Sequence, residues 1–365
     1  MPRRWMPLLI VLVVCVTTAA TAQETGWVLQ GEGGLVTALV LEPATPATLY
    51  AATARGIYKT TDGGRSWRNR GLGLEGRSVL SLAIDPRRPS TLFATTDTGG
   101  VFKSSDAGEH WISANNGLTA RYVGAVAVDP HAPSTIYAGS ESGRLFKSVD
   151  DGGLWVETTS PTTRICVTAI TLDPVKAGTI YVGTNSEGVF KSVDGGAKWT
   201  HMTNGLKRGT VWNITIDGAS SETVYAGTHE GFYRSANGGA LWTPSNHGLT
   251  SINILSLVED PKSPSTLFAG TAAGIFQSLD AGTSWRPVAP DLYATAVAMD
   301  PELTSTLYAG THLGVLKTLD RGSRWSPLRL AARVDVEAPA LPLLPVVEKR
   351  KAAERPQPVV PVVPQ

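Results

Sequence analysis

The sequence is poor in cysteine, which limits how the fold can be stabilised. Only Cys15 and Cys166 occur among 365 residues, and Cys15 lies in an apolar run near the N-terminus. If that run is removed, the single remaining cysteine cannot form an internal disulfide. Cys166 stands between Ile165 and Val167, which favours a small buried side chain over a reactive thiol. Stability must therefore come from packing.

Neither sign of charge is in marked excess. The chain has 32 Lys and Arg against 31 Asp and Glu, a net charge of +1. Loss of the N-terminal segment with Arg3 and Arg4 would change this to −1. There is consequently no bulk electrostatic reason to expect nucleic-acid binding.

Familiar catalytic and ligand-binding motifs are also missing. The sequence has no G-x-S-x-G nucleophile motif, no phosphate-binding glycine loop and no histidine cluster with metal-ligand spacing. We therefore predict no metal and no cofactor.

Long apolar runs are absent, but a short one lies at the N-terminus. Arg3 and Arg4 precede the apolar stretch 8–16, and Ala20-Thr21-Ala22 follows it. These are the charged, apolar and small-residue regions of a secretory signal. The stretch is shorter than the roughly 20 residues that cross a bilayer. We expect residues 1–22 to be cleaved off, and the protein to be exported to the periplasm or the exterior without a membrane span.

What the sequence does contain is one signature, S/T-x-D/N-x-G-x-x-W, repeated seven times. Successive copies, called boxes here, are 44, 44, 44, 43, 43 and 40 residues apart. A period of roughly 40 to 45 residues in a strand-rich pattern is typical of a four-stranded propeller blade. The sequence therefore predicts an all-β, seven-bladed propeller over residues 23–330, with one box per blade. The paired box residues are Asp62 and Trp67, Asp106 and Trp111, Asp150 and Trp155, Asp194 and Trp199, Asn237 and Trp242, Asp280 and Trp285, and Asp320 and Trp325.

Each repeat contains four segments with strand character. In the second repeat these are 79–84, 91–95, 101–104 and a short segment after Trp111, which we call strands A to D. Strand A alternates large and small apolar residues, so Leu80 and Leu82 are expected to pack between blades. One strand B aromatic per repeat is predicted to fill the same layers. These aromatics are Tyr50, Phe93, Tyr137, Tyr181, Tyr225, Phe268 and Tyr308.

The box itself is predicted to be a folding device. Its Asp or Asn can accept hydrogen bonds from the backbone of its own turn, its Gly permits a positive φ, and its Trp fixes the hairpin to the sheet. A catalytic or calcium-binding role for the aspartates is disfavoured, because the copies lie on separate blades.

Both ends of the propeller leave questions open. The segment Trp27-Val28-Leu29-Gln30 resembles a leftover outer strand that could close the ring, although 325–330 already supplies one there. Residues 331–365 are rich in Pro and Val and are predicted to be disordered or polyproline II, serving as a spacer or a docking peptide.

The boxes, with Tyr-Ala-Gly-Thr at 225–228 and 308–311 and Gly-Val-Phe-Lys-Ser at 188–192, resemble the BNR/Asp-box repeat superfamily over residues 27–330. Within it the chain looks like photosystem II stability/assembly factor-like proteins, sortilin-type propellers and the propellers of xyloglucanase-type glycoside hydrolases. The first group implies an exported single propeller that binds proteins without known chemistry. Strand B lacks the Trp typical of that group, which puts a photosynthetic role in doubt.

The other branches fit less well. Sialidases resemble six-bladed rings with an Arg-Ile-Pro segment, which is missing here. Xyloglucanase-type enzymes place two catalytic aspartates between two seven-bladed domains. This sequence contains only one such domain. Sortilin-type receptors add a cysteine-rich module and a membrane span.

The D-to-A and B-to-C loops vary most between repeats and should share one face of the ring. Their arginines, aromatics and acids suit binding of a protein loop or a glycan. We predict a non-enzymatic, monomeric scaffold for a partner protein, with a polysaccharide as the alternative ligand. The predicted binding face comprises Arg55, Arg77, Asp97, Arg121, Tyr122, Glu141, Arg144, Arg164, Lys207, Arg208, Trp212, His229, Asp291, Tyr293 and His312.

An enzymatic role would need a pair of carboxylates about 5 to 9.5 Å apart for glycoside cleavage. Glu187 and Glu230 occupy equivalent turns of adjacent repeats and are the candidates for that pair. His229 and His312 lie in corresponding turns two blades apart, and two histidines at that separation do not change the prediction of no metal. Trp212 stands out as a binding residue, although its place in the alternation would also suit packing between blades.

Overall fold

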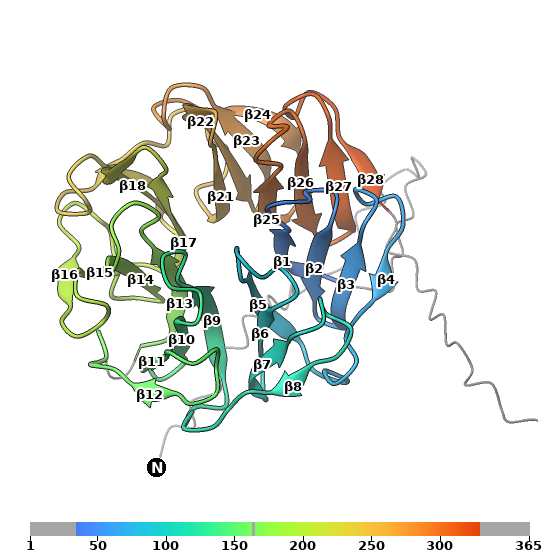
Figure 1. Cartoon of the computed structure of the whole chain (residues 1–365). Helices are drawn as coiled ribbons and strands as arrows, with labels where there is room; N and C mark the ends of the chain where they lie inside the picture. The colour runs from blue at the N-terminus through green and yellow to red at the C-terminus, as the bar shows by residue number, and fades with distance from the viewer. Residues whose placement is uncertain (1–33, 163–164, 329–365) are drawn as a thin grey trace, which may run out of the picture. The chain divides into compact units, whose positions relative to one another are not determined.

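The computed structural model describes residues 34–162 and 165–328, which form 28 strands in seven four-stranded antiparallel sheets arranged as a ring. This is the predicted seven-bladed propeller (Figure 1). Within these residues there is no helix long and apolar enough to cross a membrane. The proposed signal segment, the strand expected at Trp27 and the proline-rich tail all lie outside the described residues.

Each blade is built from one continuous stretch of chain. The strand order in every sheet follows the chain order, from strand A beside the channel to strand D at the rim. Blades 1 and 2 contain β1 (Val36–Leu41), β2 (Leu49–Thr53), β3 (Gly56–Thr60), β4 (Arg68–Asn69), β5 (Val79–Ile84), β6 (Leu92–Thr96), β7 (Gly100–Ser104) and β8 (Ile112–Ser113). The predicted strands of the second repeat thus agree with the structure to within one residue at each end.

The remaining blades repeat this plan. Blades 3 to 5 contain β9 (Val123–Val128), β10 (Ile136–Ser140), β11 (Leu145–Ser148), β12 (Val156–Glu157), β13 (Val167–Leu172), β14 (Ile180–Thr184), β15 (Val189–Ser192), β16 (Thr200–Met202), β17 (Val211–Asp217), β18 (Ser220–Thr228), β19 (Gly231–Ser235) and β20 (Thr243–Pro244). Blades 6 and 7 contain β21 (Ile254–Asp260), β22 (Ser263–Thr271), β23 (Gly274–Ser278), β24 (Arg286–Pro290), β25 (Ala294–Met299), β26 (Leu307–Thr311), β27 (Gly314–Thr318) and β28 (Ser326–Leu328).

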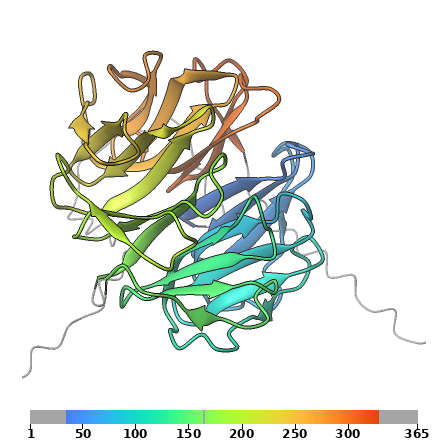
Figure 2. The ribbon, with the colours of Figure 1, turned by 60° about the vertical axis from the view of Figure 1, so that its left-hand side comes forward.

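The ring closes by side-chain contacts between blades 7 and 1. Strand β28 is the outer strand of blade 7, as predicted for 325–330. Lys317 Nζ donates a hydrogen bond to the Gly63 carbonyl at 2.8 Å, and Val36 of β1 packs close to Gly310 of β26. Figure 2 shows the blades from the side, with turns at both faces of the ring.

The boxes have the conformation that the sequence predicts. In blade 3, Asp150 Oδ1 accepts hydrogen bonds from Ser148 Oγ at 2.6 Å and from the Leu154 N–H at 2.9 Å. In blade 1, Gly64 has φ +92°, and a Cβ there would lie 2.2 Å from Leu328 Cδ1 of blade 7. Glycine at this position is required both by the backbone and by the neighbouring blade.

The box tryptophans join neighbouring blades. Trp155 is 2 % exposed, and its Nε1–H donates to the Ala114 carbonyl of blade 2 at 2.7 Å. Trp111, Trp242 and Trp285 make the equivalent bond. The strand B aromatics are buried as predicted, at 0–2 % exposure.

A lysine adds a second connection at five of the seven joints, where a joint is the contact between two neighbouring blades. In this latch, a strand C lysine lies over the strand B aromatic and donates to a box carbonyl of the next blade. Joints 5|6 and 6|7 lack it, because Arg234 and Gln277 replace the lysine. The latches are Lys59 to Ala107 O, Lys103 to Asp151 O, Lys147 to Gly195 O, Lys191 to Gly238 O and Lys317 to Gly63 O.

Candidate functional site

The two faces of the ring carry different turns. The D-to-A and B-to-C connections meet on one face, as the bond from the Gly100 N–H to the Arg121 carbonyl illustrates. The boxes meet the A-to-B turns on the other, where the Gly63 N–H donates to the Ala47 carbonyl. We call these the loop face and the box face.

A β-bulge at the start of strand A is common to all seven blades. In blade 2, for example, Val79 pairs with Thr96 and Ser81 with Thr95, so Leu80 has no partner across the ladder. A bulge turns the extra side chain away from the position that strict alternation would give it. The seven bulge residues are Thr37, Leu80, Gly124, Thr168, Trp212, Leu255 and Thr295.

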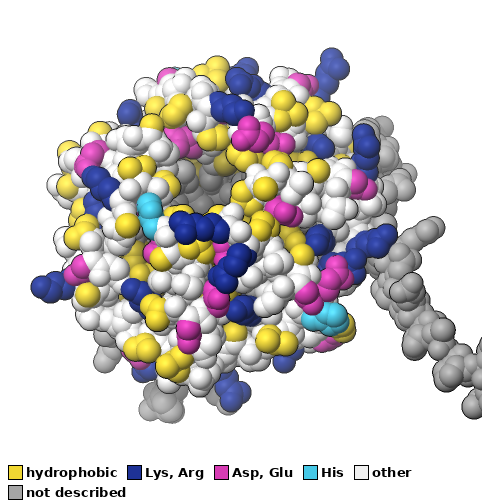
Figure 3. All heavy atoms as spheres, viewed as in Figure 1, with side chains coloured by type: hydrophobic (Ala, Val, Ile, Leu, Met, Phe, Trp, Pro, Cys, Tyr) yellow, Lys and Arg dark blue, Asp and Glu magenta, His cyan; other side chains and the backbone are white. Residues whose placement is uncertain are grey.

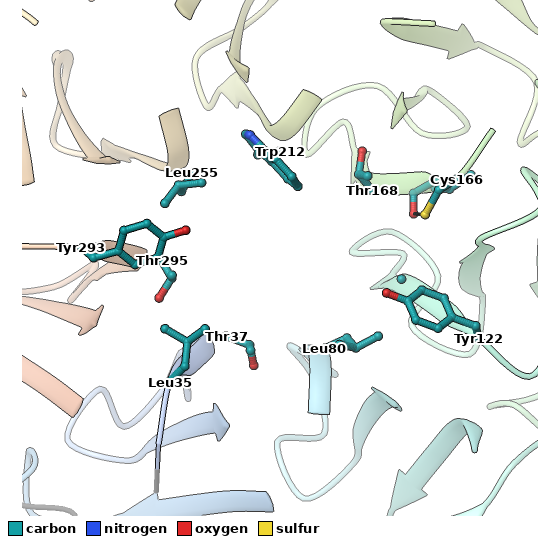
Figure 4. A pocket seen from close by; sticks show the side chains of 12 residues that line it. Leu35, Thr37, Leu80, Tyr122, Cys166, Thr168, Trp212, Leu255, Tyr293 and Thr295 are labelled. Atoms are coloured by element: carbon teal, nitrogen blue, oxygen red, sulfur yellow. Dashed lines mark hydrogen bonds between the residues drawn. The ribbon is translucent and has the colours of Figure 1, made fainter. Parts of the chain in front are cut away.

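All seven bulge residues line one cavity of about 210 Å³ in the central channel, which we call the funnel mouth. Figure 4 shows side chains from different blades pointing toward this shared space. No Asp, Glu, Lys, Arg or His is among the described residues that line it. The other lining residues are Leu35, Tyr122, Cys166, Val167 and Tyr293.

The bulges correct two sequence-based expectations. The alternation of strand A predicts that Leu80 packs between blades, and it permits the same role for Trp212. Instead both line the funnel mouth. The inserted residue shifts the alternation by one position, and a period-two pattern does not reveal that shift.

Several polar groups of the wall are already bonded to neighbouring blades. Thr37 Oγ1 donates to the Val79 carbonyl and Thr168 Oγ1 to the Val211 carbonyl, both at 2.6 Å. Trp212 Nε1–H donates to Asn253 Oδ1 of blade 6 at 2.9 Å. These three donors are therefore satisfied, and the wall offers methyl groups, aromatic rings and the hydroxyl groups of Tyr122 and Tyr293 to a ligand.

The titratable groups of the funnel mouth are held in their neutral forms. Burial raises the pKa of Tyr122 and of Tyr293. Burial also raises the pKa of the Cys166 thiol to about 11, which fits the expectation of an unreactive cysteine. Cys166 is half-buried beside the cavity, however, so it is not the fully buried side chain that the sequence suggested.

The predicted binding residues fall into two groups. Tyr122, Trp212 and Tyr293 meet in the funnel mouth, and His312 lies edge-on to Tyr293 with ring centroids 6.4 Å apart. The charged residues lie around it in the turns of the loop face. Of these, Arg55, Arg121, Glu141, Arg144, Lys207, Arg208, His229 and Asp291 are exposed, Arg77 and Asp97 are half-buried, and Arg164 lies outside the described residues.

Some of the rim charges are engaged locally. Arg77 lies over the Phe102 ring, 5.3 Å from its centroid, and Arg144 Nη1 is 3.5 Å from Glu157 Oε2. Figure 3 shows one face of the ring, with charged side chains of both signs around a central hollow. The rim therefore offers mixed charge around an uncharged mouth.

The carboxylates considered for catalysis stay outside the channel. Glu187 and Glu230 lie in B-to-C turns whose N–H groups bond to Thr184 and Thr228. Neither lines the funnel mouth or the cavity of about 300 Å³ that continues along the channel. Within 34–162 and 165–328, no three His, Cys, Asp or Glu side chains are grouped as a metal site would require.

Comparison with solved structures shows the same fold in proteins of different activity. The chain is similar to a GH74 xyloglucanase from Xanthomonas campestris, with a TM-score of 0.67 and 20 % identity over 82 % of this chain and 54 % of the enzyme. It therefore spans about half the length of that enzyme. A GH74 enzyme from Niastella koreensis gives a TM-score of 0.65 at 19 % identity, over 81 % of this chain and 54 % of the enzyme.

A second kind of neighbour has about the size of one propeller. A structure titled YCF48 bound to D1 peptide matches with a TM-score of 0.62 and 12 % identity, over 79 % of this chain and 94 % of the other. At these identities the likeness establishes the seven-bladed fold alone. No protein-family model and no curated protein matches the sequence.

Proposed function

We propose that this protein is a non-catalytic scaffold that binds a partner protein at its loop face, with an uncharged, apolar segment of the partner entering the funnel mouth. The observation that supports this most is the lining: one Trp, two Tyr and three Leu side chains surround the cavity without a charged group. Aromatic side chains in a partly desolvated pocket are the usual centres of binding energy at protein interfaces.

The channel leaves room for a segment of the partner to enter. The funnel mouth measures about 210 Å³ and continues into a cavity of about 300 Å³, which the same seven bulge residues also line. The rim would then contact the rest of the partner. Its arginines and acids can form charge-assisted hydrogen bonds with peptide groups and side chains around the inserted segment.

Two further findings agree with this proposal. A solved propeller that matches 79 % of this chain over 94 % of its own length is titled YCF48 bound to D1 peptide. The N-terminal charged, apolar and small-residue pattern supports a role in the periplasm or outside the cell.

A polysaccharide ligand is the second candidate, because aromatic rings also stack on sugars and the fold is shared with xyloglucanases. It has less support here, since Glu187 and Glu230 are absent from both channel cavities. Cleavage would also require two carboxylates about 5 to 9.5 Å apart at the bound sugar.

Crosslinked affinity capture from the native cell envelope, followed by mass spectrometry, tests the two candidates. Wild type is compared with W212A, and with L319A, which changes an exposed side chain on the box face. We expect one defined protein to be captured by wild type and L319A and lost from folded W212A. Equal capture by all three would reject the funnel mouth as the site.

A parallel assay addresses the second candidate. Binding and cleavage of envelope polysaccharides would be measured with wild type and an E187Q/E230Q variant. Cleavage that disappears in the variant would replace the scaffold proposal by an enzymatic one.

A further inference from the structure

One carboxylate occupies a position that is otherwise aliphatic in every blade. Glu259 is the penultimate residue of β21, next to the buried Asp260. The equivalent residues of the other blades are Leu41, Ile84, Val128, Leu172, Ile216 and Met299. This strand A position is therefore apolar in the other six blades. In blade 6 it holds a titratable side chain at the contact with blade 5.

The surroundings of Glu259 satisfy only half of its carboxyl group. Oε2 accepts a hydrogen bond at 3.1 Å from the Gly218 N–H of blade 5. Oε1 is buried and has no hydrogen-bond partner within the described part of the chain. The adjacent cavity of about 470 Å³ is walled largely by apolar side chains, including Ile216 and Leu257.

The charged groups around Glu259 do not favour a further negative charge. Asp217 on blade 5 and Asp260 on its own strand are acidic, and Arg321 of blade 7 lies 3.7 Å from Asp260. Tyr225 and Arg234 of blade 5 also lie near this joint. The Tyr225 hydroxyl has no hydrogen-bond partner in the described chain, and Glu259 forms no ion pair with Arg234 there.

This joint also lacks the lysine latch, because Arg234 stands in place of the lysine. Besides apolar packing and the bonds of Trp285 to blade 5, three polar contacts bridge joint 5|6. The Ser245 hydroxyl donates to the Thr283 carbonyl at the rim. The contact of Glu259 with Gly218 lies at the box face, and that of Trp212 with Asn253 lies at the loop face. These last two contacts involve β17 or the turn that follows it.

We infer that Glu259 is a pH-sensing group that loosens the joint between blades 5 and 6 when it loses its proton. Neutral Glu259 fits the apolar place, whereas the ionised form must be solvated, which favours opening of the cavity wall. Because Trp212 is on β17, loosening at the box face reaches the funnel mouth through a strand of seven residues. Only this last effect on ligand binding depends on the proposed function.

The direction of the pH effect follows from the raised pKa. Burial raises the pKa of Glu259 from 4.5 to about 7, with Asp217 and Asp260 adding to the shift. The folded protein therefore binds this proton more tightly than the unfolded chain. The destabilisation from ionisation is absent below about pH 4.5, grows as pH rises to about 7, and is complete above it.

The test compares thermal unfolding of wild type, E259Q and E259L from pH 4.5 to 8.5. Glutamine keeps the shape without titrating, and leucine restores the aliphatic side chain of the other blades. We expect the Tm of wild type to fall relative to both variants by roughly 2 to 5 °C between pH 5 and 8. The control variant E302Q removes an exposed carboxyl group from the A-to-B turn of blade 7. Its Tm should change with pH in parallel with that of wild type.

Hydrogen exchange then locates the change. After correction for the intrinsic rate, β17 and β21 of wild type should lose protection as pH rises, and those of E259Q should not. Wild type and both Glu259 variants melting in parallel at all pH values would overturn the inference. So would a pH-dependent loss of protection that persists in E259Q. Neither result would bear on whether the funnel mouth binds a partner.

Discussion

The box face and the loop face of this ring follow different rules. On the box face every blade uses the same turn, because two consecutive residues with positive φ and a bonded Asp or Asn allow few alternatives. On the loop face each blade places a bulge residue in the channel, and threonine, leucine, glycine and tryptophan all occur there. The first face is constrained by its backbone, and the second is free to differ. We therefore look for stability on one and recognition on the other.

The largest expected effect on stability comes from removing a box tryptophan that is hydrogen-bonded to the neighbouring blade. W155A should lower the free energy of unfolding by about 3 to 5 kcal/mol, because it empties a fully buried site and removes the bond to Ala114. W199A should cost clearly less, since Trp199 is only half-buried and its Nε1–H has no partner among the described residues. Guanidinium unfolding of both variants measures this difference, and equal losses would contradict it.

The latches should contribute a smaller amount at each joint. K191M keeps the apolar stem but removes the bond to Gly238 and the contact with the Tyr181 ring, so we expect a loss of about 1 kcal/mol. The reverse change, R234K, offers joint 5|6 the missing lysine beside Tyr225. It should raise stability slightly in the same unfolding assay. A destabilised R234K would show that the arginine has a role which the latch pattern does not explain.

The box aspartates should make the fold sensitive to acid. Hydrogen bonds from Ser148 and from the Leu154 N–H lower the pKa of Asp150. Their stabilising effect is present above the ordinary value of 3.8 and is lost as pH falls through the lower folded value. D150N should weaken this dependence at its own box, because Asn237 makes the equivalent bonds in blade 5. Acid unfolding curves identical for D150N and wild type would contradict this account.

The smallest effect on stability is expected in the funnel mouth. W212A should change the free energy of unfolding by only about 1 kcal/mol, because Trp212 is half-buried and its main bond is the one to Asn253. Thermal unfolding beside the binding assay separates the two effects. A loss as large as that of W155A would make Trp212 a scaffold residue.

The sequence predicts the regular parts of this molecule well and the site only in part. Blade number, strand order and the buried strand B aromatics follow from spacing and alternation, which repeat in every blade. Tyr122, Trp212 and Tyr293 can be predicted as binding residues because they lie in or beside the variable D-to-A loops. The sequence does not predict that they line one cavity with Leu80 and Leu255, because the bulge breaks the alternation without a characteristic residue. Nor does it reveal Glu259, since one carboxylate beside the acidic end of a strand looks ordinary until the seven repeats are superposed.

The most direct test of the central claim is site-directed photocrosslinking in the native cell envelope. A benzophenone side chain would replace Tyr293 in the funnel mouth or, as the matched control, Leu319 on the box face, where the side chain is 66 % exposed. We predict that the Tyr293 position crosslinks to one partner protein through an uncharged, apolar segment, and that the Leu319 position does not. Crosslinks from Leu319 alone, or none to protein from either position, would contradict the claim that the funnel mouth holds a partner.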